Sequence, residues 1–237
     1  MKKLLVFAIA TLLAFSMNAQ KFGVKAGANM SGYTINFWTP DESHMAMGFN
    51  AGLLGEYEVN DQMSIRADVT FNQKGSDYDK TTDVAGVDMV TAQTTDVSYL
   101  NIGVGPKLNF GPAYVFVGPY FGYALSSVTN LTVDLGETNL LTVEDLDNFG
   151  AIADGGTDDL LNKIDFGLNL ALGTSFSGVF IEANVGYGVL NYINHDSQYY
   201  SITNYADKDD NTVALTDDAK QNNLFFGFSV GYMLGGE

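Results

Sequence analysis

The chain has 237 residues, no cysteine and a formal net charge of −17, from 28 acidic and 11 basic residues. Without cysteine there is no disulfide, no thiolate metal site and no lipid-modified cysteine to anchor the chain. A surface this acidic repels the phosphate backbone, so the charge excludes a nucleic-acid partner.

The first nineteen residues have the three parts of a secretion signal. Met1–Lys3 is basic, Leu4–Phe15 is apolar, and Ala19 supplies a small residue before a cleavage site. The apolar run of about twelve residues is shorter than the roughly 17–25 that a transmembrane helix needs. We therefore predict a cleaved signal peptide over residues 1–19 and one domain over residues 20–237.

Eight later segments alternate between large apolar residues and small or polar ones. Because successive side chains of a strand point to opposite faces, each segment is a strand with one apolar face. The C-terminal segment is the clearest, with Phe226, Phe228 and Val230 separated by glycine and serine. In chain order the predicted strands are residues 22–30, 49–58, 63–72, 101–109, 113–126, 164–173, 179–189 and 224–234.

The fifth predicted strand, residues 113–126, is apolar on both faces and is the hardest to orient. We expect its odd-numbered large residues to face outward: Val115, Val117, Phe121, Tyr123 and Leu125.

The connections alternate in length. Short turns fall at residues 59–61, 110–112 and 177–178, whereas the other connections are long: 32–46, 75–96, 127–162 and 191–222. Short periplasmic turns and long extracellular loops are typical of outer-membrane barrels. A soluble barrel would have an apolar interior, whereas these polar faces carry charges. We predict an all-β, eight-stranded antiparallel up-and-down transmembrane β-barrel with four long extracellular loops.

Charged residues fall on the polar faces of the predicted strands, and six of them form the candidate group. An eight-stranded barrel has room inside for side chains but not for a wide pore. Buried charges persist when they are paired, so we predict a luminal ion-pair network. A proton or ion pathway through the same residues is the alternative. The candidates are Lys25, Glu56, Arg66, Asp68, Lys107 and Glu182.

The strand sequences resemble the PorT-type family of outer-membrane barrels. The likeness begins at Phe22-Gly-Val-Lys-Ala-Gly-Ala-Asn-Met-Ser31 and continues through residues 48–57, 63–75, 99–107, 117–123 and 166–188. The named member of that family takes part in protein secretion across the outer membrane. The resemblance implies the fold and a role in the envelope, and it covers no catalytic motif.

Three short motifs raise other chemistries. Gly227-Phe-Ser-Val-Gly231 matches the G-x-S-x-G of hydrolases, but it lies inside a strand and not at the strand-to-helix turn that this motif needs. His195 beside Asp196 at a barrel rim could activate water. Residues 207–218 have an EF-hand-like spacing of acids, without the turn glycine and the final glutamate.

These observations predict a monomeric, non-enzymatic protein of the cell outer membrane, without a cofactor, that acts as an envelope or secretion accessory through its extracellular loops or rim. Its expected partners are outer-membrane lipid, lipopolysaccharide, the barrel assembly machinery and an envelope or secretion protein. The alternative is a surface ligand-binding or adhesion protein with acidic loops, which are candidates for calcium binding. A rim-located hydrolase that uses His195 and Asp196 is the third hypothesis.

Overall fold

The computed structural model describes residues 21–33, 43–147, 161–191 and 221–235. The predicted signal peptide, residues 1–19, lies outside these ranges and stays a prediction. Nine strands form one antiparallel sheet in the described part of the chain. They are β1 (Lys21–Tyr33), β2 (Ser43–Asn60), β3 (Met63–Val84), β4 (Val87–Phe110), β5 (Ala113–Leu135), β6 (Thr138–Asp147), β7 (Ile164–Phe176), β8 (Val179–Gly188) and β9 (Asn223–Leu234).

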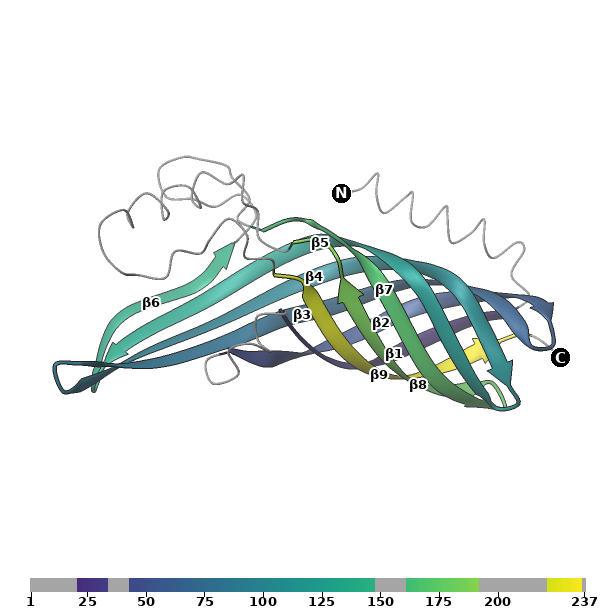
Figure 1. The fold of residues 1–237 in the computed structure, drawn as a ribbon, viewed down its shortest axis with the longest axis horizontal. Coiled ribbons are helices and arrows are strands. Elements are labelled where there is room, and N and C mark those ends of the chain that lie inside the picture. The colour runs from purple at the N-terminus through teal and green to yellow at the C-terminus, as the bar shows by residue number, and fades with distance from the viewer. Residues whose placement is uncertain (1–20, 34–42, 148–160, 192–220, 236–237) are drawn as a thin grey trace.

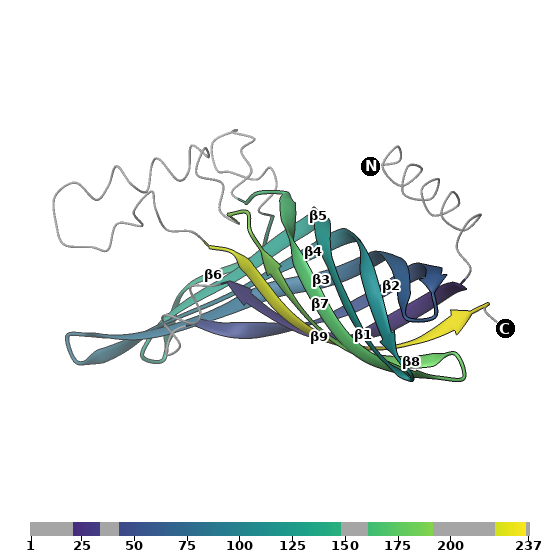
Figure 2. The same cartoon turned by 45° about the vertical axis from the view of Figure 1, so that its right-hand side comes forward.

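The sheet closes into a ring (Figures 1 and 2). Consecutive strands pair from β1 to β5, β5 continues to β7, and the chain then pairs through β8 to β9. The first and last strands complete the ring, with Phe22 opposite Leu234 and Tyr33 opposite Asn223. Strand β6 pairs only with β5 among the described residues. The sequence analysis missed this ninth strand.

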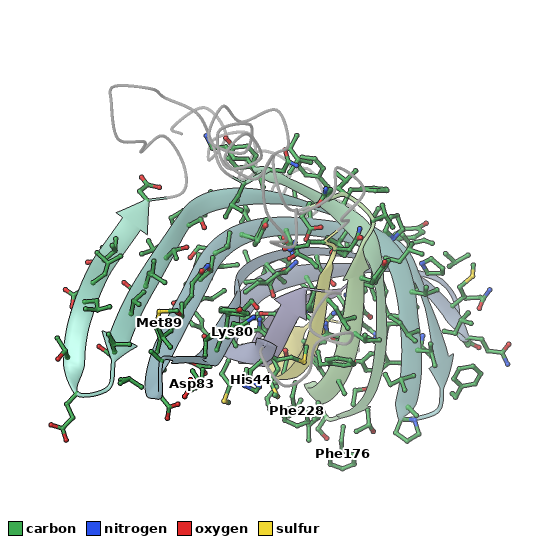
Figure 3. The ribbon with its side chains drawn as sticks, turned by 60° about the vertical axis from the view of Figure 1, so that its left-hand side comes forward. His44, Lys80, Asp83, Met89, Phe176 and Phe228 are labelled. Carbon is green, nitrogen blue, oxygen red and sulfur yellow. The ribbon has the colours of Figure 1, made fainter. Side chains whose placement is uncertain are left out.

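The alternation seen in the sequence separates the two faces of the ring. On β9, Phe226, Phe228 and Val230 are about half exposed on the outside, whereas Ser229 is buried inside. Phe228 and Phe176, labelled in Figure 3, lie on this outer surface. The predicted orientation of the fifth strand is confirmed, because Val117, Phe121 and Leu125 are exposed while the even-numbered residues from Tyr114 to Ala124 are buried. No described segment forms a helix long and apolar enough to cross a membrane.

Short turns join the strands at the end of the ring where β1 begins and β9 ends. Gly111 and Gly178 have φ angles of 67° and 82° in two of these turns. Glycine has no Cβ, so it adopts this left-handed region without a steric cost. These turns fix neighbouring strands in register with their apolar faces on the same side.

The loops predicted at 75–96 and 127–162 are wrong in large part. Strands β3 and β4 continue to a turn at Ala85 and Gly86, and β5 continues to a turn before β6. We call the part beyond the ring the projecting sheet; it comprises residues 75–84, 87–98, 126–135 and 138–147. Figure 1 shows it extending to the left, past β7, β8 and β9. Its sequence predicts loop because threonines and aspartates interrupt the alternation of apolar and polar residues.

A β-bulge marks where the fifth strand passes from the ring into the projecting sheet. Ser98 pairs with Ser126, but the next pair is Tyr99 with Ala124, so Leu125 has no opposite residue. The extra residue shifts the inward phase of β5 from even to odd positions. Ser127 and Thr129 are therefore buried, as are Tyr120 and Ala124 before the bulge.

Candidate functional site

The interior of the ring holds a dense group of charged side chains near the turn end, which we call the lower layer: Lys25, Glu56, Arg66, Asp68, Lys107 and Glu182. Arg66 on β3 is at its centre and is 1% exposed. Its guanidinium donates from Nη2 to Glu182 Oε1 at 3.1 Å and from Nη1 to Glu182 Oε2. Its Nε donates to Asp68 Oδ1 at 2.8 Å. A guanidinium held by two carboxylates in this way is fixed in orientation as well as in charge.

Lys25 and Tyr114 complete the bonds around Glu182. Lys25 Nζ lies 3.2 Å from Glu182 Oε1 and 3.7 Å from Asp68 Oδ2. The Tyr114 hydroxyl donates to Glu182 Oε2 at 3.0 Å. Glu182 thus accepts from three side chains on three other strands. Its desolvation is offset by two cations and a hydroxyl donor.

Lys107 and Glu56 form the second part of the lower layer. Lys107 Nζ is 2.8 Å from both Glu56 oxygens. The same ammonium lies 4.3 Å from the centre of the Tyr114 ring, and the Arg66 guanidinium lies 5.0 Å from that of Phe116. Aromatic faces attract cations at such distances, most strongly where water is excluded. The structure therefore places all six residues singled out from the sequence inside the ring and brings each into an ion pair.

A second charged group, the upper layer, lies toward the projecting sheet: Lys74, Asp165, Tyr99, Tyr120 and Phe225. Lys74 Nζ is 2.8 Å from Asp165 Oδ2, and the Tyr120 hydroxyl donates to the same oxygen at 3.0 Å. Three rings surround the ammonium, at 4.9 Å for Tyr99, 5.0 Å for Tyr120 and 4.2 Å for Phe225.

Sequence reasoning missed the pair of Lys74 and Asp165, although a signal was present. The predicted third strand ends at Asn72, yet the period of two that carries Arg66 to the inside also carries Lys74 there. Asp165 lies in the polar phase of the predicted strand 164–173, but nothing in the sequence identifies the cation that it meets.

A cavity of about 30 Å³ separates the two layers. Lys25 and Asp68 of the lower layer and Tyr120 and Phe225 of the upper layer contribute to its wall. Most of the remaining wall consists of uncharged polar side chains: Asn50, Thr70, Asn72, Asn101, Asn169 and Asn184.

Positive and negative charges balance inside the ring. The buried charged residues of the described chain are four cations (Lys25, Arg66, Lys74, Lys107) and four anions (Glu56, Asp68, Asp165, Glu182). Since each cation lies within 4 Å of an anion, the interior is neutral and internally paired. This arrangement cross-links strands that are not neighbours in the sheet.

The projecting sheet has a different chemistry. Its outward face carries seven aspartates and no lysine or arginine: Asp77, Asp79, Asp83, Asp88, Asp96, Asp134 and Asp147. Partial burial, together with the nearby carboxylate of Asp77, raises the pKa of Asp96 above its usual value. Figure 3 shows His44, Lys80, Asp83 and Met89 in this region. The described residues contain no group of three or more His, Asp or Glu placed to hold a metal ion.

Two sites considered from the sequence lie outside the described residues. They are the His195–Asp196 pair and the EF-hand-like segment at 207–218. The Gly227–Gly231 motif is described and lies within β9, with Ser229 buried and its hydroxyl donating to Asn50 Oδ1 at 2.8 Å. A serine in the middle of a paired strand lacks the exposed turn on which hydrolases place their nucleophile.

Comparison with solved structures finds barrels of three bacteria. Ail, the attachment invasion locus protein of Yersinia pestis, is 11% identical with a TM-score of 0.36, over 91% of this chain and 99% of Ail. Neisserial surface protein A is 12% identical with a TM-score of 0.34, over 90% and 95% of the two chains. CarO of Acinetobacter baumannii is 18% identical with a TM-score of 0.36, over 88% and 97%.

Comparison with curated proteins finds no match. The family comparison does find one, and it spans all strands from β1 to β8. Residues 17–194 match the family described as outer membrane protein beta-barrel domain, and the chain therefore belongs to this family of outer-membrane proteins.

Proposed function

We propose that this protein is a non-enzymatic envelope or secretion accessory that binds a protein partner through its projecting sheet. The observation that carries the proposal is the unequal length of the strands. Strands β3, β4 and β5 have 22, 24 and 23 residues, whereas β7, β8 and β9 have 13, 10 and 12. A strand of about 9–11 residues is enough to cross a membrane, so about half of each long strand is available for other contacts.

The orientation follows the usual rule for outer-membrane barrels. Their short turns are periplasmic and their longer connections are extracellular. The turns at Gly111 and Gly178 lie at the end where β1 begins and β9 ends. We therefore place this end in the periplasm and the projecting sheet outside the cell, with lipid and lipopolysaccharide around a single copy of the ring.

The two faces of the projecting sheet differ in chemistry. This difference favours a role in binding a partner over a role as a spacer that only lengthens the ring. One face carries the seven aspartates described above. The opposite face continues the inner face of the ring and carries apolar residues among threonines and Lys80, with Val84 and Val87 more than 40% exposed at its tip. Apolar side chains on an extracellular sheet are a common basis of protein contacts. The PorT-type resemblance of the strands agrees with a protein partner in the envelope.

The lumen supports binding in preference to transport. Two ion-paired layers fill the ring above and below a cavity of about 30 Å³. An eight-stranded ring has little interior space beyond its own side chains. We therefore expect no stepwise conductance when the purified protein is reconstituted in planar lipid bilayers; open channels would contradict this part of the proposal.

A surface ligand-binding or adhesion role is the second candidate. The specific observation in its favour is the face of seven aspartates without lysine or arginine. Such a face attracts cationic ligands at low ionic strength, and salt weakens the attraction. Calcium recruitment by the acidic loops belongs to this second candidate.

Site-specific photo-crosslinking in intact cells tests the proposal. A crosslinker at Thr81 probes the acidic face and one at Thr82 probes the opposite face, because neighbouring strand residues point to opposite sides. A crosslinker at Leu168, on the outside of the ring, is the control. We expect a discrete protein adduct from Thr81 or Thr82 and none from Leu168. Adducts with lipopolysaccharide alone from all three positions would refute the proposal.

A variant with a shortened projecting sheet provides a second test of the proposed function. Residues 77–94 are replaced by a two-residue turn, since the flanking Ser76 and Thr95 are opposite each other in the ladder. The ring should still fold, as reported by heat-modifiable gel mobility, while the protein adduct at a retained position such as Asn130 is lost. Retention of the adduct would place the partner elsewhere.

A further inference from the structure

We propose that a hinge joins the projecting sheet to the ring, at residues 73–75 of β3 and at Ser98 and Tyr99 of β4. The hinge lets the projecting sheet tilt as one body relative to the ring. This proposal goes beyond the function proposed above and does not depend on it, because it concerns how the sheet moves and not what it binds.

The ladders on both sides of the β3–β4 pair are interrupted at the same level. On one side the register between β2 and β3 shifts where residues 46–49 lie against residues 73–75. On the other side the register between β4 and β5 shifts between Ser98 and Tyr99. Because Gln73 is opposite Ser98, the two irregularities lie beside the same part of the β3–β4 ladder. A bulge locally disrupts a ladder and bends the strand that contains it.

In the described part of the chain, the β3–β4 ladder alone crosses this level without a change of register. It is continuous from Met63 to Val84 on β3, and Figure 1 shows both strands passing from the ring into the projecting sheet. The pairing of β5 with β7 ends just below, at Tyr123 opposite Ile164. A ribbon of two strands twists more than a broad sheet and is less stable by itself. Bending is therefore concentrated at this level.

Two side chains of β1 take the place of β2 at the hinge. Main-chain groups two residues apart on a strand point to the same neighbour, so those of Gln73 and Gly75 share a direction. The Asn29 amide donates to Gln73 O at 2.6 Å. The Ser31 hydroxyl donates to Gly75 O at 3.3 Å and accepts from Gly75 N at 2.7 Å. The β3 backbone thus has partners here without a ladder to β2, although β1 and β3 are not neighbours in the ring.

Strand β3 is the pivot of the hinge. Lys74 Nζ lies 2.8 Å from Asp165 Oδ2 on β7, and this ion pair holds β3 from across the lumen. Asn29 and Ser31 hold the same level from β1. On β5, by contrast, the extra residue Leu125 is exposed on the outside and has no opposite residue on β4. The projecting sheet therefore swings about β3.

Distances between pairs of spin labels test the hinge. The chain has no cysteine, so pairs of introduced cysteines label the full-length protein specifically, and double electron–electron resonance in lipid nanodiscs gives each distance distribution. Labels at Asp83 and Leu168 span the hinge, those at Val24 and Leu168 stay within the ring, and those at Asp83 and Thr94 stay within the projecting sheet. We expect the distribution across the hinge to be about twice as broad as the other two. Equal widths would overturn the proposal. So would a pair within the sheet as broad as the pair across the hinge, because the sheet itself would then be flexible.

Deletion of Leu125 tests whether the bulge on β5 causes the bending. The deletion makes the β4–β5 ladder continuous and keeps Ser126 opposite Ser98, so no side chain changes face. The distribution across the hinge should narrow to about the width measured within the ring. A properly folded deletion variant with an unchanged width would show that the bulge is not part of a hinge.

Ser31→Ala tests the pivot without altering a ladder. The variant removes both bonds to Gly75, so the distribution across the hinge should broaden. Ser64→Ala is the matched control, because Ser64 is also buried but bonds to Asn109 near the turn end of the ring. We expect no change from Ser64→Ala. Equal widths in both variants would contradict the role of Ser31. If the Leu125 deletion fails to fold, the three wild-type distributions together with Ser31→Ala still decide the question.

Discussion

Lys74 on β3 and Asp165 on β7 meet across the lumen, with 2.8 Å between Nζ and Oδ2, although they are 91 positions apart and their strands are not neighbours in the ring. Hydrogen bonding between adjacent strands fixes the ring locally. Ion pairs across the lumen, such as Lys74 with Asp165, hold opposite sides of the ring at a fixed distance. The same holds for Arg66 and Glu182 in the lower layer, on β3 and β8. The interior charges therefore stabilise a particular cross-section of the ring.

Asp165→Asn should destabilise the protein by roughly 3–5 kcal/mol, because it leaves the buried Lys74 ammonium without its counter-charge. The double variant Lys74→Met, Asp165→Leu should lose much less, since replacing a buried pair with apolar groups is often nearly neutral. Urea unfolding in lipid vesicles, followed by gel mobility, measures both. A double variant less stable than the single one would show that the pair itself contributes net stability.

Glu182→Gln should cost more than Glu56→Gln. Glu182 interacts with Arg66, Lys25 and Tyr114, whereas Glu56 holds Lys107. Loss of the Glu182 charge leaves two cations underpaired, and loss of the Glu56 charge leaves one. The same unfolding measurement ranks the two variants, and equal losses would mean that Asp68 alone suffices to hold Arg66 and Lys25.

Much of the ring could be predicted from the sequence because its strands obey a strict period of two. Alternate apolar residues on β7 and β9 predict which face of these strands is outside. On β1, β3 and β8 the polar residues Lys25, Arg66 and Glu182 predict which face is inside. Which charges meet could not be predicted, because that depends on the stagger between strands that are distant in the sequence. Arg66 has Glu56 opposite it on β2, yet its guanidinium bonds across the lumen to Glu182.

The projecting sheet was missed for a different reason. Residues 138–147 contain three acids and a bulge at Asp145, where φ is 55°. Neither face of this segment is uniformly apolar, so the periodicity that identifies a strand is absent. Its strand structure depends on pairing with the extended β5, which no local pattern records. The strands of the ring can be predicted from local alternation, whereas β6 is a strand because it pairs with β5.

Gly186→Ala should be tolerated poorly but should be rescued by a second substitution. A Cβ at Gly186 would lie 2.1 Å from the ring of Phe225, and every close atom belongs to that side chain. Overpacking of this kind typically costs about 1–3 kcal/mol. Gly186→Ala with Phe225→Leu should recover part of the loss in the same unfolding assay, because the smaller side chain leaves room for the methyl group.

Gly27→Ala is the matched control for this rescue. A Cβ at Gly27 would lie 1.9 Å from the backbone oxygen of Phe228, so no side-chain substitution can make room. We expect Gly27→Ala to fail in folding with or without Phe228→Leu. Recovery of folding by Phe228→Leu would show that the strands at this position separate more easily than the geometry indicates.

Asp96→Asn should stabilise the projecting sheet at neutral pH and have no effect in acid. Burial and the neighbouring Asp77 raise the pKa of Asp96 in the folded protein above the ordinary value of 3.8. A raised carboxyl pKa means that the folded state holds the proton more tightly than the unfolded state. The ionised form is therefore destabilising, and this cost is absent below the unfolded pKa, develops as the pH rises from the unfolded to the folded pKa, and is constant above it. Asparagine carries no charge at any pH and removes the cost.

Amide hydrogen exchange of β3 and β4 beyond Gly75 reports the local effect of Asp96→Asn on the projecting sheet. Protection should increase in Asp96→Asn at pH 7, and the difference from wild type should vanish as the pH falls below about 3.8. Asp88→Asn, near the tip of the same face, is the control, and an equal gain in protection from it would show that the general acidity of the sheet is responsible, with no special role for the environment of Asp96.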